Sequence, residues 1–210
     1  TPLTVEQREY VQYILDSSEL LKDVLGNVLD FSKIEAGKLE LRYKPVNLEL
    51  FCRETLRLIH FHAMEKGLSL DLKYDEHIPP ILMADSLRLQ QVLLNLLGNA
   101  VKFTERGGVL LSARLAAPAS SEEKAAIIFS VNDTGIGMSQ DELSRILRPF
   151  EQADNSSTRR YGGSGLGLPI ASSILSLMGS SLEIRSEAGK GSVFSFTLRL
   201  DSGGINPIIC

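Results

Sequence analysis

The spacing of apolar residues changes along this chain, and the change divides it into two parts. In the N-terminal part, apolar positions recur at alternating steps of three and four residues, as in an amphipathic helix. The seam is formed by Val11, Ile14, Leu21, Leu25 and Val28. It predicts one long helix that is capped by Thr4, runs to about Ile34 and stops near Gly37. One helix cannot bury such a stripe alone, so we expect a partner helix, with an ordinary long surface helix as the alternative.

After residue 38 the pattern predicts short strands and helices. Strand-like alternation occupies residues 38–48, where Pro45 interrupts it, and residues 68–75, 107–117, 125–133, 181–187 and 192–200. Helical periodicity occupies residues 48–66, 85–103, 139–147 and 166–178. Asp85 and Ser139 suit N-cap positions, and Pro169 falls in a first helical turn, where proline is tolerated. Strands in runs favour an α+β fold: a two-layer α/β sandwich, with helices on one face of a mixed sheet, preceded by the long helix.

Composition narrows the class of protein. Of 210 residues, 43% are hydrophobic, which is enough for a sizeable core, and the net charge of −4 gives no basic field for nucleic acid. The two cysteines, Cys52 and Cys210, form no disulfide framework, which fits a reducing, cytoplasmic compartment. No apolar run reaches membrane-spanning length, and no signal peptide is visible. Because the chain opens at Thr1 without a methionine, we expect a soluble piece of a longer protein, whose membrane attachment stays open.

Three polar side chains share one face of the apolar helix in residues 85–103. Asn95, Asn99 and Lys102 follow each other at i, i+4 and i+7. Amides and a lysine on an otherwise apolar helix are costly unless something satisfies them. A site for a cation and phosphate groups would do so, since Mg²⁺ takes few protein ligands when a nucleotide supplies oxygens. A stripe that faces solvent is the alternative.

The strand in residues 125–133 ends at a carboxylate beside glycines. Asp133 is followed by Gly135 and Gly137. A carboxylate at a strand end can accept a hydrogen bond from an exocyclic amine, while glycine backbone approaches a flat ring. An ordinary Asp-Gly turn is the alternative.

Residues 148–163 form a polar segment that is too long for a tight turn, and such segments are usually functional or disordered. Phe150 could anchor the segment, and Arg159 and Arg160 could reach phosphate oxygens or form a solvated charge pair. We expect residues 152–161 to be mobile without nucleotide. The glycine loop that follows, "GGSGLGLPI", matches neither the G-x-G-x-x-G dinucleotide fingerprint nor a Walker loop that ends in Gly-Lys-Ser/Thr.

Taken in order, these motifs resemble the ATP-binding catalytic domain of sensor histidine kinases, in the superfamily that includes DNA gyrase, the ninety-kilodalton heat-shock chaperone and MutL. "NLLGNAVKFT" is similar to the family's N box and "DTGIGM" to its first glycine box. "RPFEQAD" resembles the F box, "GGSGLGLPI" the second glycine box and "GKGSVFSF" the last. "FSKIEAGKLEL" resembles the junction that follows the dimerisation helices in hybrid-type kinases.

The resemblance implies roles for single residues. Asp133 would accept from the adenine amine, Asn99 would ligate Mg²⁺, and Asn95 and Lys102 would lie near the phosphates as candidate catalytic side chains. The further implied nucleotide-binding residues are Gly135, Gly137, Phe150, Arg159, Arg160, Gly163, Ser164, Gly165, Leu166, Gly167 and Leu168. The implied ligands are ATP or ADP with Mg²⁺.

The resemblance also implies an organisation and partners. Residues 1–38 would be the second helix of a dimerisation hairpin, residues 39–200 the ATP-binding domain, and residues 201–210 an unassigned tail. A second kinase subunit and a response-regulator receiver domain are the implied protein partners. His60, His62 and His77 lie in no phosphoacceptor context, so we expect these 210 residues to bind Mg·ATP without phosphorylating themselves.

Two other functions stay open. ATP hydrolases of the superfamily resemble one another in carrying a glutamate base one turn before the magnesium asparagine. Here that position is Asn95, whose amide cannot take a proton at neutral pH, which disfavours hydrolysis and favours transfer to another nucleophile. A nucleotide-binding scaffold without turnover is the second alternative. His60 and His62 do not suggest a metal pair, because i, i+2 positions on a helix point apart.

Overall fold

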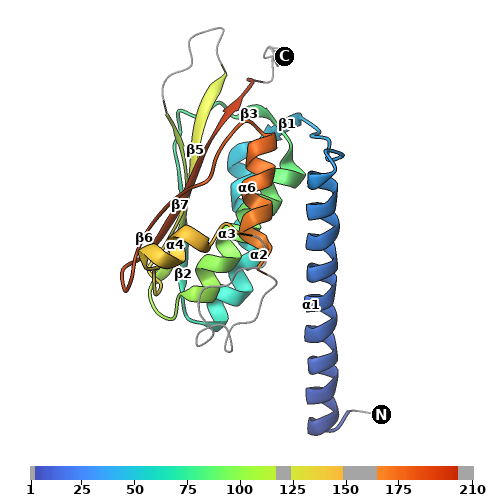
Figure 1. Ribbon diagram of the computed structural model, residues 1–210. Coiled ribbons are helices and arrows are strands. Elements are labelled where there is room, and N and C mark those ends of the chain that lie inside the picture. Colours follow the sequence, from blue (N-terminus) through green and yellow to red (C-terminus); the bar gives the residue numbers. More distant parts are fainter. Residues whose placement is uncertain (1–2, 117–123, 149–164, 203–210) are drawn as a thin grey trace, which may run out of the picture.

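The computed structural model describes residues 3–116, 124–148 and 165–202. A five-stranded sheet forms one layer, three helices pack on one of its faces as the second layer, and a long helix, α1, stands beside them (Figure 1). This confirms the predicted α+β sandwich with a preceding helix. No helix in the described ranges is long and apolar enough to span a bilayer.

The sheet has the strand order β2-β4-β5-β7-β6. The bounds are Ser69–Tyr74 for β2, Gly108–Leu115 for β4, Ala125–Asp133 for β5, Glu183–Glu187 for β6 and Gly191–Leu200 for β7. β2 pairs with β4 in parallel and every other pair is antiparallel, so the sheet is mixed as predicted. β5 and β7 pair along Ala125 to Asp133, which brings Asp133 opposite Ser192.

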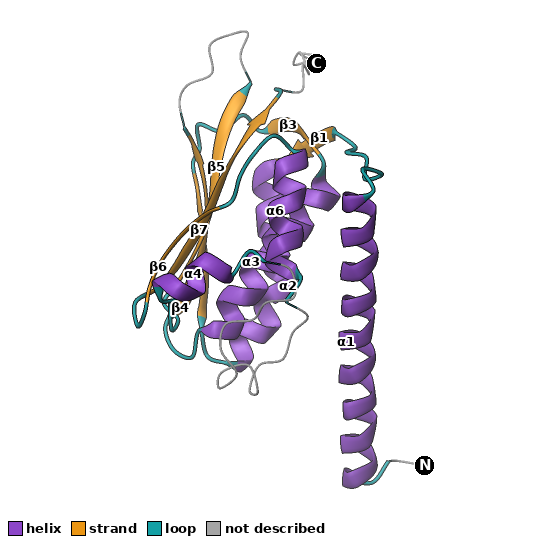
Figure 2. Ribbon diagram, viewed as in Figure 1, coloured by secondary structure: helices purple, strands orange, loops and turns teal. Residues whose placement is uncertain are grey.

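The helical layer consists of α2 (Leu48–Glu65), α3 (Ser86–Phe103) and α6 (Gly167–Leu177), which lie on the same face of the sheet (Figure 2). α3 is central, with Leu93, Leu96 and Leu97 fully buried against the sheet and the neighbouring helices. On the sheet side, the rings of Phe129 and Phe196 stack with their centroids 5.1 Å apart. A short helix, α4 (Gln140–Arg145), starts at Ser139, which forms a capping box with Glu142.

The region around Pro45 differs from the sequence-based expectation. The predicted strand in residues 38–48 is too long: residues 38–43 form no strand, and Pro45 lies inside β1 (Lys44–Asn47) without breaking it. β1 pairs antiparallel with β3 (Ile81–Ala84), a strand that the pattern did not predict. In a two-stranded ribbon each strand is an edge, so a proline without an N–H can be accommodated. β3 is only four residues long, too short to show a period before the helix that follows.

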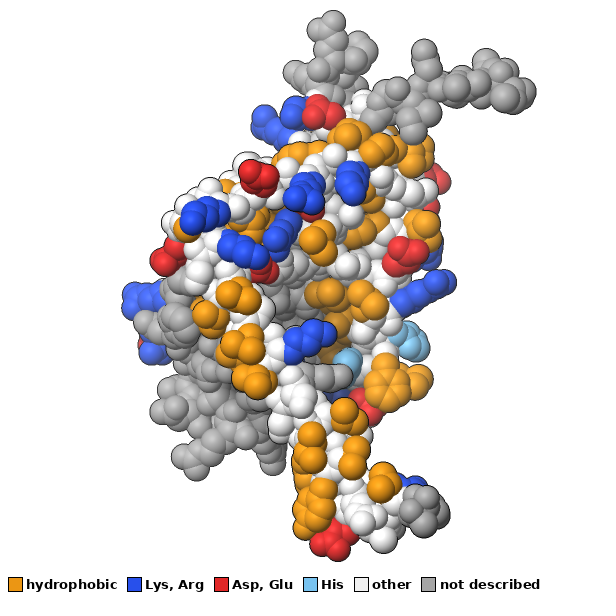
Figure 3. Space-filling view, turned by 90° about the vertical axis from the view of Figure 1, so that its right-hand side faces the viewer, with side chains coloured by type: hydrophobic (Ala, Val, Ile, Leu, Met, Phe, Trp, Pro, Cys, Tyr) orange, Lys and Arg blue, Asp and Glu red, His pale blue; other side chains and the backbone are white. Residues whose placement is uncertain are grey.

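Helix α1 (Val5–Glu35) begins and ends as predicted. Thr4 caps it, because its hydroxyl accepts from the Gln7 amide while the Gln7 side chain accepts from the Thr4 amide. The predicted seam of Val11, Ile14, Leu21, Leu25 and Val28 is exposed along its length. Figure 3 shows hydrophobic side chains on the part of this helix that projects from the body of the molecule.

Polar contacts hold the C-terminal half of α1 against α3. Asp30 Oδ2 lies 3.2 Å from Arg88 Nη1 and accepts from Gln91 Nε2 at 2.7 Å. Arg88 also donates to Gln91 Oε1 at 2.7 Å, so the three side chains form a closed set, here called the α1 clamp. The side chains of Arg88 and Asp30 are only 18% and 20% exposed, so their attraction is weakly screened by solvent. One turn beyond the clamp, Ile34 packs against the hydrophobic core.

We predict that Asp30→Ala loosens the C-terminal half of α1, because the change leaves the half-buried Arg88 without its carboxylate. Losing a charged hydrogen-bond partner of this kind costs about 1–3 kcal/mol. Amide hydrogen exchange in residues 24–35 should become faster in the variant. Glu9→Ala, which removes an exposed acid from the same helix, is the matched control and should leave that exchange unchanged. Equal exchange in both variants would show that the clamp does not hold the helix.

Candidate functional site

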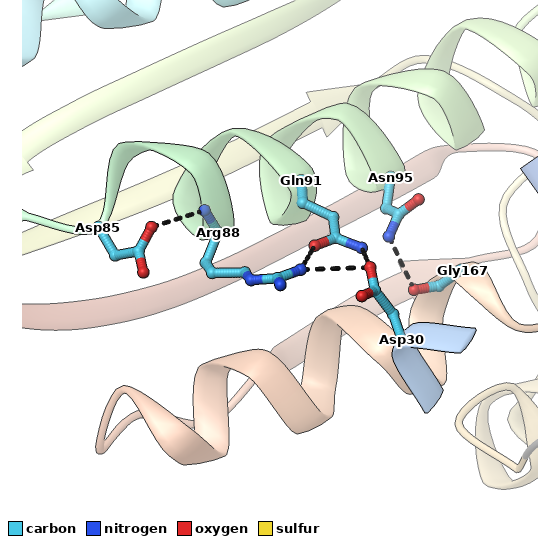
Figure 4. A network of polar contacts seen from close by, with 6 residues as sticks. All are labelled: Asp30, Asp85, Arg88, Gln91, Asn95 and Gly167. Atoms are coloured by element: carbon cyan, nitrogen blue, oxygen red, sulfur yellow. Dashed lines mark hydrogen bonds and ion pairs between the residues drawn. The ribbon is translucent and has the colours of Figure 1, made fainter. Parts of the chain in front are cut away.

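Helix α3 carries one continuous polar stripe. Arg88, Gln91, Asn95, Asn99 and Lys102 are spaced three or four residues apart, so they share one face of the helix. Arg88 and Gln91 form the α1 clamp, and Asn95 Nδ2 donates to Gly167 O, in the first turn of α6, at 3.1 Å (Figure 4). Asn99 and Lys102, further along the stripe, are partly buried. The predicted polar face is therefore real, and the Asn95 contact joins it to the start of α6.

Both ends of α3 are held by charged side chains. At the N-terminus, Asp85 Oδ1 accepts from the Arg88 amide at 3.0 Å and Oδ2 accepts from the Arg42 amide at 2.7 Å. At the C-terminus, Lys66 Nζ donates to the carbonyls of Val101 and Lys102 at 2.8 and 2.7 Å. A carboxylate at the start and an ammonium at the end both suit the helix dipole. These contacts at both ends fix the position of α3, and with it the polar stripe.

Lys102 lies at the end of the polar stripe, near the ammonium group of Lys66. Burial lowers the pKa of Lys102, and the positive charge of Lys66 lowers it further. The ammonium of Lys102 lies 4.9 Å from the centre of the Phe103 ring, within cation–π range. Lys66 in turn interacts with the carboxylate of Glu105, which raises the pKa of Lys66 and partly offsets its burial, so positive and negative charges both lie at this end of α3.

The carboxylate of Asp133 is fixed by the backbone around it. Asp133 Oδ1 accepts from the Gly135 amide at 2.9 Å and from the Ser192 amide at 3.2 Å. Burial raises the pKa of Asp133 above its usual range, while these two amides and the Ser192 side chain act in the opposite direction. The result is a partly buried, oriented acceptor at the end of β5.

Glycine is required where three backbone segments converge around Asp133. A Cβ on Gly135 would lie 2.5 Å from the carbonyl oxygen of Phe103 and 2.9 Å from Asp133 Oδ1. A Cβ on Gly137 would meet the carbonyl oxygen of Glu187, and both Gly137 and Gly191 have positive φ. Only glycine fits such close approach without a shift of backbone.

Hydrogen bonds fix the loop that contains these glycines. The amide of Ile136 donates to Phe103 O at 3.2 Å, at the end of α3, and the amide of Gly189 donates to Ile136 O at 2.7 Å, from the β6–β7 turn. Thr134 Oγ1 accepts from the Gly108 amide at 3.1 Å and donates to Arg106 O at 3.1 Å. The loop is therefore held between α3, β4 and the β6–β7 turn.

The glycine loop leads directly into α6. Gly165 has φ +68°, a conformation that favours glycine, and Leu166 is buried at the N-cap position. Among the described residues, the N-cap residue Leu166 forms no side-chain capping hydrogen bond, and Pro169 in the first turn has no N–H to donate. The first amides of α6 and the positive end of its dipole therefore suit an anionic ligand.

The structure brings part of the predicted site together around α3. Asn95 contacts the α6 start that holds Gly165, Leu166, Gly167 and Leu168, and Phe103 contacts the loop of Asp133, Gly135 and Gly137. Phe150, Arg159, Arg160, Gly163 and Ser164 lie outside the described residues, and so does the segment 152–161 expected to be mobile.

Other sequence-based expectations concern histidine and cysteine. His60, His62 and His77 are exposed, and no three His, Cys, Asp or Glu side chains of the described ranges gather as a metal site. Cys52 is buried, and its burial raises the pKa of its thiol to about 12, so it is unreactive packing.

Sequence reasoning missed residues that support the site from a distance in the chain. The spacing places Lys66 at a helix end and Ser192 in a strand, and it indicates no role for Thr134. The glycines of "GKGSVFSF" could have drawn attention to Ser192, since that motif was already part of the resemblance. No local signal distinguishes Lys66 from other surface lysines.

An oriented carboxylate beside glycines, two lysines at the end of α3 and a glycine-containing helix start are features that suit a nucleotide. The sequence profile described as histidine kinase-, DNA gyrase B-, and HSP90-like ATPase matches residues 84–202. This is more than half of the chain, and the chain belongs to that family. It carries an ATP-binding catalytic domain of the kind found in histidine kinases.

Relatives with similar sequences are themselves kinases. The chain is 40% identical over 211 residues to the signal transduction histidine-protein kinase BarA of Escherichia coli, which covers 100% of this chain and 22% of that protein. It is 40% identical over 210 residues to the hybrid signal transduction histidine kinase F of Dictyostelium discoideum, covering 99% and 19%. The chain thus spans about a fifth of the length of these relatives.

Among solved structures, full-length ShkA in complex with AMPPNP superimposes with a TM-score of 0.79 at 38% identity. The superposition covers 96% of this chain and 40% of that one. The likeness therefore extends beyond the catalytic domain and includes α1.

We predict that Gly135→Ala destabilises the protein, because its methyl group would displace the Phe103 carbonyl or the Asp133 carboxylate. Overpacking of this kind costs about 1–3 kcal/mol in the free energy of unfolding, measured with urea. Gly98→Ala is the matched control, because a Cβ there meets nothing within 4 Å in the interior of α3. That control should be neutral or gain about 0.5–1 kcal/mol. Equal stability of Gly135→Ala and the unaltered protein would contradict the tight approach.

Proposed function

We propose that this chain is the catalytic module of a sensor histidine kinase, which transfers the γ-phosphate of ATP to a histidine of a helical hairpin. The observation that carries the proposal is Asn95, which occupies the polar stripe between the clamp and Asn99 and donates to Gly167 at the start of α6. An amide at this position can orient a phosphate but cannot act as a base toward water at neutral pH. This favours phosphoryl transfer over ATP hydrolysis.

The residues have distinct proposed roles in nucleotide binding. Asp133 accepts a hydrogen bond from the adenine amine, and Gly135 and Gly137 let backbone approach the ring. Lys102 and the first amides of α6 attract the phosphates, together with Arg159, Arg160 and Ser164. Phe150 anchors the segment that precedes the glycine loop.

Asn99 is the proposed protein ligand of Mg²⁺. Its amide oxygen is of the hard type that Mg²⁺ prefers, and a single protein ligand is sufficient when phosphate oxygens complete the coordination. When bound, the ion would neutralise charge on the phosphates. Asn95 and Lys102 then orient the terminal phosphate toward the acceptor.

The proposed partners follow from the family and from α1. Residues 1–38 are proposed to be the second helix of a dimerisation hairpin, residues 39–200 the ATP-binding domain and 201–210 a tail. The exposed seam of α1 would then pair with helices of the hairpin in a homodimer. A receiver domain is the proposed recipient of the phosphoryl group in a two-component phosphorelay, and the cytoplasm the proposed location. A scaffold without turnover is the competing function.

We predict that the site prefers ATP and ADP over GTP by roughly a hundredfold or more, because a 6-oxo group of guanine would face the Asp133 carboxylate without donating a hydrogen bond to it. Affinity for ADP should fall as the pH is lowered through the raised pKa of Asp133, because the protonated carboxyl group is a weaker acceptor. Calorimetric titration measures both effects. Asp133→Asn should reduce the base preference and the pH dependence together, and a protein that binds GTP as well as ATP would refute this role.

The experiment that tests phosphoryl transfer uses ATP labelled at the γ-phosphate and Mg²⁺. The 210-residue chain should bind Mg·ATP but form no acid-labile, base-stable phosphate on itself. A supplied hairpin that carries an acceptor histidine should become labelled, slowly because it is not tethered. A chain that binds ATP and labels no hairpin would favour the scaffold, and rapid release of free phosphate would favour the hydrolase.

Asn99→Ala is the informative variant in the same experiment. It should abolish labelling and weaken Mg²⁺-dependent binding of ATP, while metal-free binding of ADP stays close to that of the unaltered chain. If both ligands are weakened equally, Asn99 is structural. Asn27 of α1, a partly exposed amide far from these residues in the chain, provides the control in Asn27→Ala, which should leave nucleotide binding unchanged.

A further inference from the structure

A second candidate site lies away from the nucleotide-binding residues, where the end of α1 meets the catalytic domain. A cavity of about 400 Å³ is bounded there by the last turn of α1, the segment 38–44 and the start of α3. Its volume lies within the range of small-molecule sites. Figure 3 shows Lys and Arg side chains gathered on the upper half of the molecule's α1 face, at the height where α1 ends.

The lining of this cavity is strongly basic. Five of its side chains are cations, Lys33, Lys38, Arg42, Lys44 and Arg88, whereas only Glu40 and Asp85 are acids. The chain as a whole has a net charge of −4, so the lining is positively charged although the chain is acidic overall. Like charges around one cavity repel each other, and a bound anion would relieve that repulsion.

The two acids of the lining are too few to balance its five cations, which leaves an excess of positive charge. Asp85 is 4% exposed, and both of its oxygens accept from backbone amides, those of Arg88 and Arg42. Arg88 is engaged by the α1 clamp. Within the described part of the chain, no ion pair involves the remaining four cations, Lys33, Lys38, Arg42 and Lys44.

We propose that this cavity binds a small molecule that carries two or more phosphate groups. The four cations come from α1, the segment after it and β1, so they approach the cavity from different parts of the chain and suit an elongated polyanion better than one isolated charge. Leu39 and Leu87 add apolar wall that an organic part of the ligand can contact. The helix dipole of α3 is not needed, since Asp85 already caps that helix.

Such a ligand would hold the same junction as the α1 clamp. Lys33 and Lys38 belong to the end of α1 and the turn after it, while Lys44 belongs to the catalytic domain through its pairing with Ala84. An anion between them fixes the orientation of α1 relative to the sheet and helices. The site is separate from Asp133 and Asn99, so the proposal does not depend on the function proposed above.

The test uses inorganic tripolyphosphate as the probe, without Mg²⁺ and at low ionic strength, with the nucleotide site occupied by saturating ADP. Calorimetry should show saturable binding, and hydrogen exchange should slow in residues 33–45. The charge-reversed variant Lys38→Glu/Arg42→Glu should bind roughly tenfold more weakly or not at all. Lys73→Glu/Arg114→Glu makes the same change of charge at exposed positions outside the cavity and should bind like the unaltered chain.

Three outcomes would overturn the proposal: no binding to the unaltered chain, equal weakening in both charge-reversed variants, or protection confined to residues outside the cavity. Both variants must keep the unfolding midpoint of the unaltered chain, which the exposure of all four side chains leads us to expect. ADP binding by Lys38→Glu/Arg42→Glu provides the separate check on the nucleotide site, and it should stay unchanged.

Discussion

The burial of α3 against the sheet determines where every other functional element lies. Its apolar face fills the space between the sheet and the neighbouring helices, and that burial leaves only one face for polar groups. Asp85 and Lys66 then hold the two ends, so the helix can neither slide nor fray without losing partly buried hydrogen bonds. A polar stripe on a helix fixed in this way has a defined position relative to the strand ends.

The same stripe serves two different contacts. Its first two turns bind Asp30 of α1, and the following turn reaches the start of α6 through Asn95. A displacement of α1 would therefore act on the helix that also carries the proposed Mg²⁺ ligand, Asn99. Physical continuity of this kind is a requirement for coupling, and coupling itself needs a second arrangement of α1 that both sites favour differently.

Glycines around Asp133 allow segments that lie far apart in the chain to meet at close range. The Asp133 loop, the end of α3 and the β6–β7 turn approach within van der Waals distance of one another, and a side chain at Gly135 or Gly191 would separate them. Ser192 then reaches Asp133 because β5 and β7 pair in one register. The orientation of the carboxylate is thus a product of sheet pairing as much as of its own loop.

The sequence by itself determined the elements whose information is local. The seam and cap of α1, the stripe of Asn95, Asn99 and Lys102, and the strand that ends at Asp133 are all visible as spacing, since period and capping depend on neighbours within a few residues. Only the tertiary structure decided the contacts between distant segments. β3 and the placement of Pro45 within β1 depend on pairing across the chain, and Lys66 caps α3 from another helix. Asp30 meets Arg88 and Gln91 only after α1 has packed against α6, beside the start of α3. Such contacts leave no periodic trace, because their cause is packing in three dimensions.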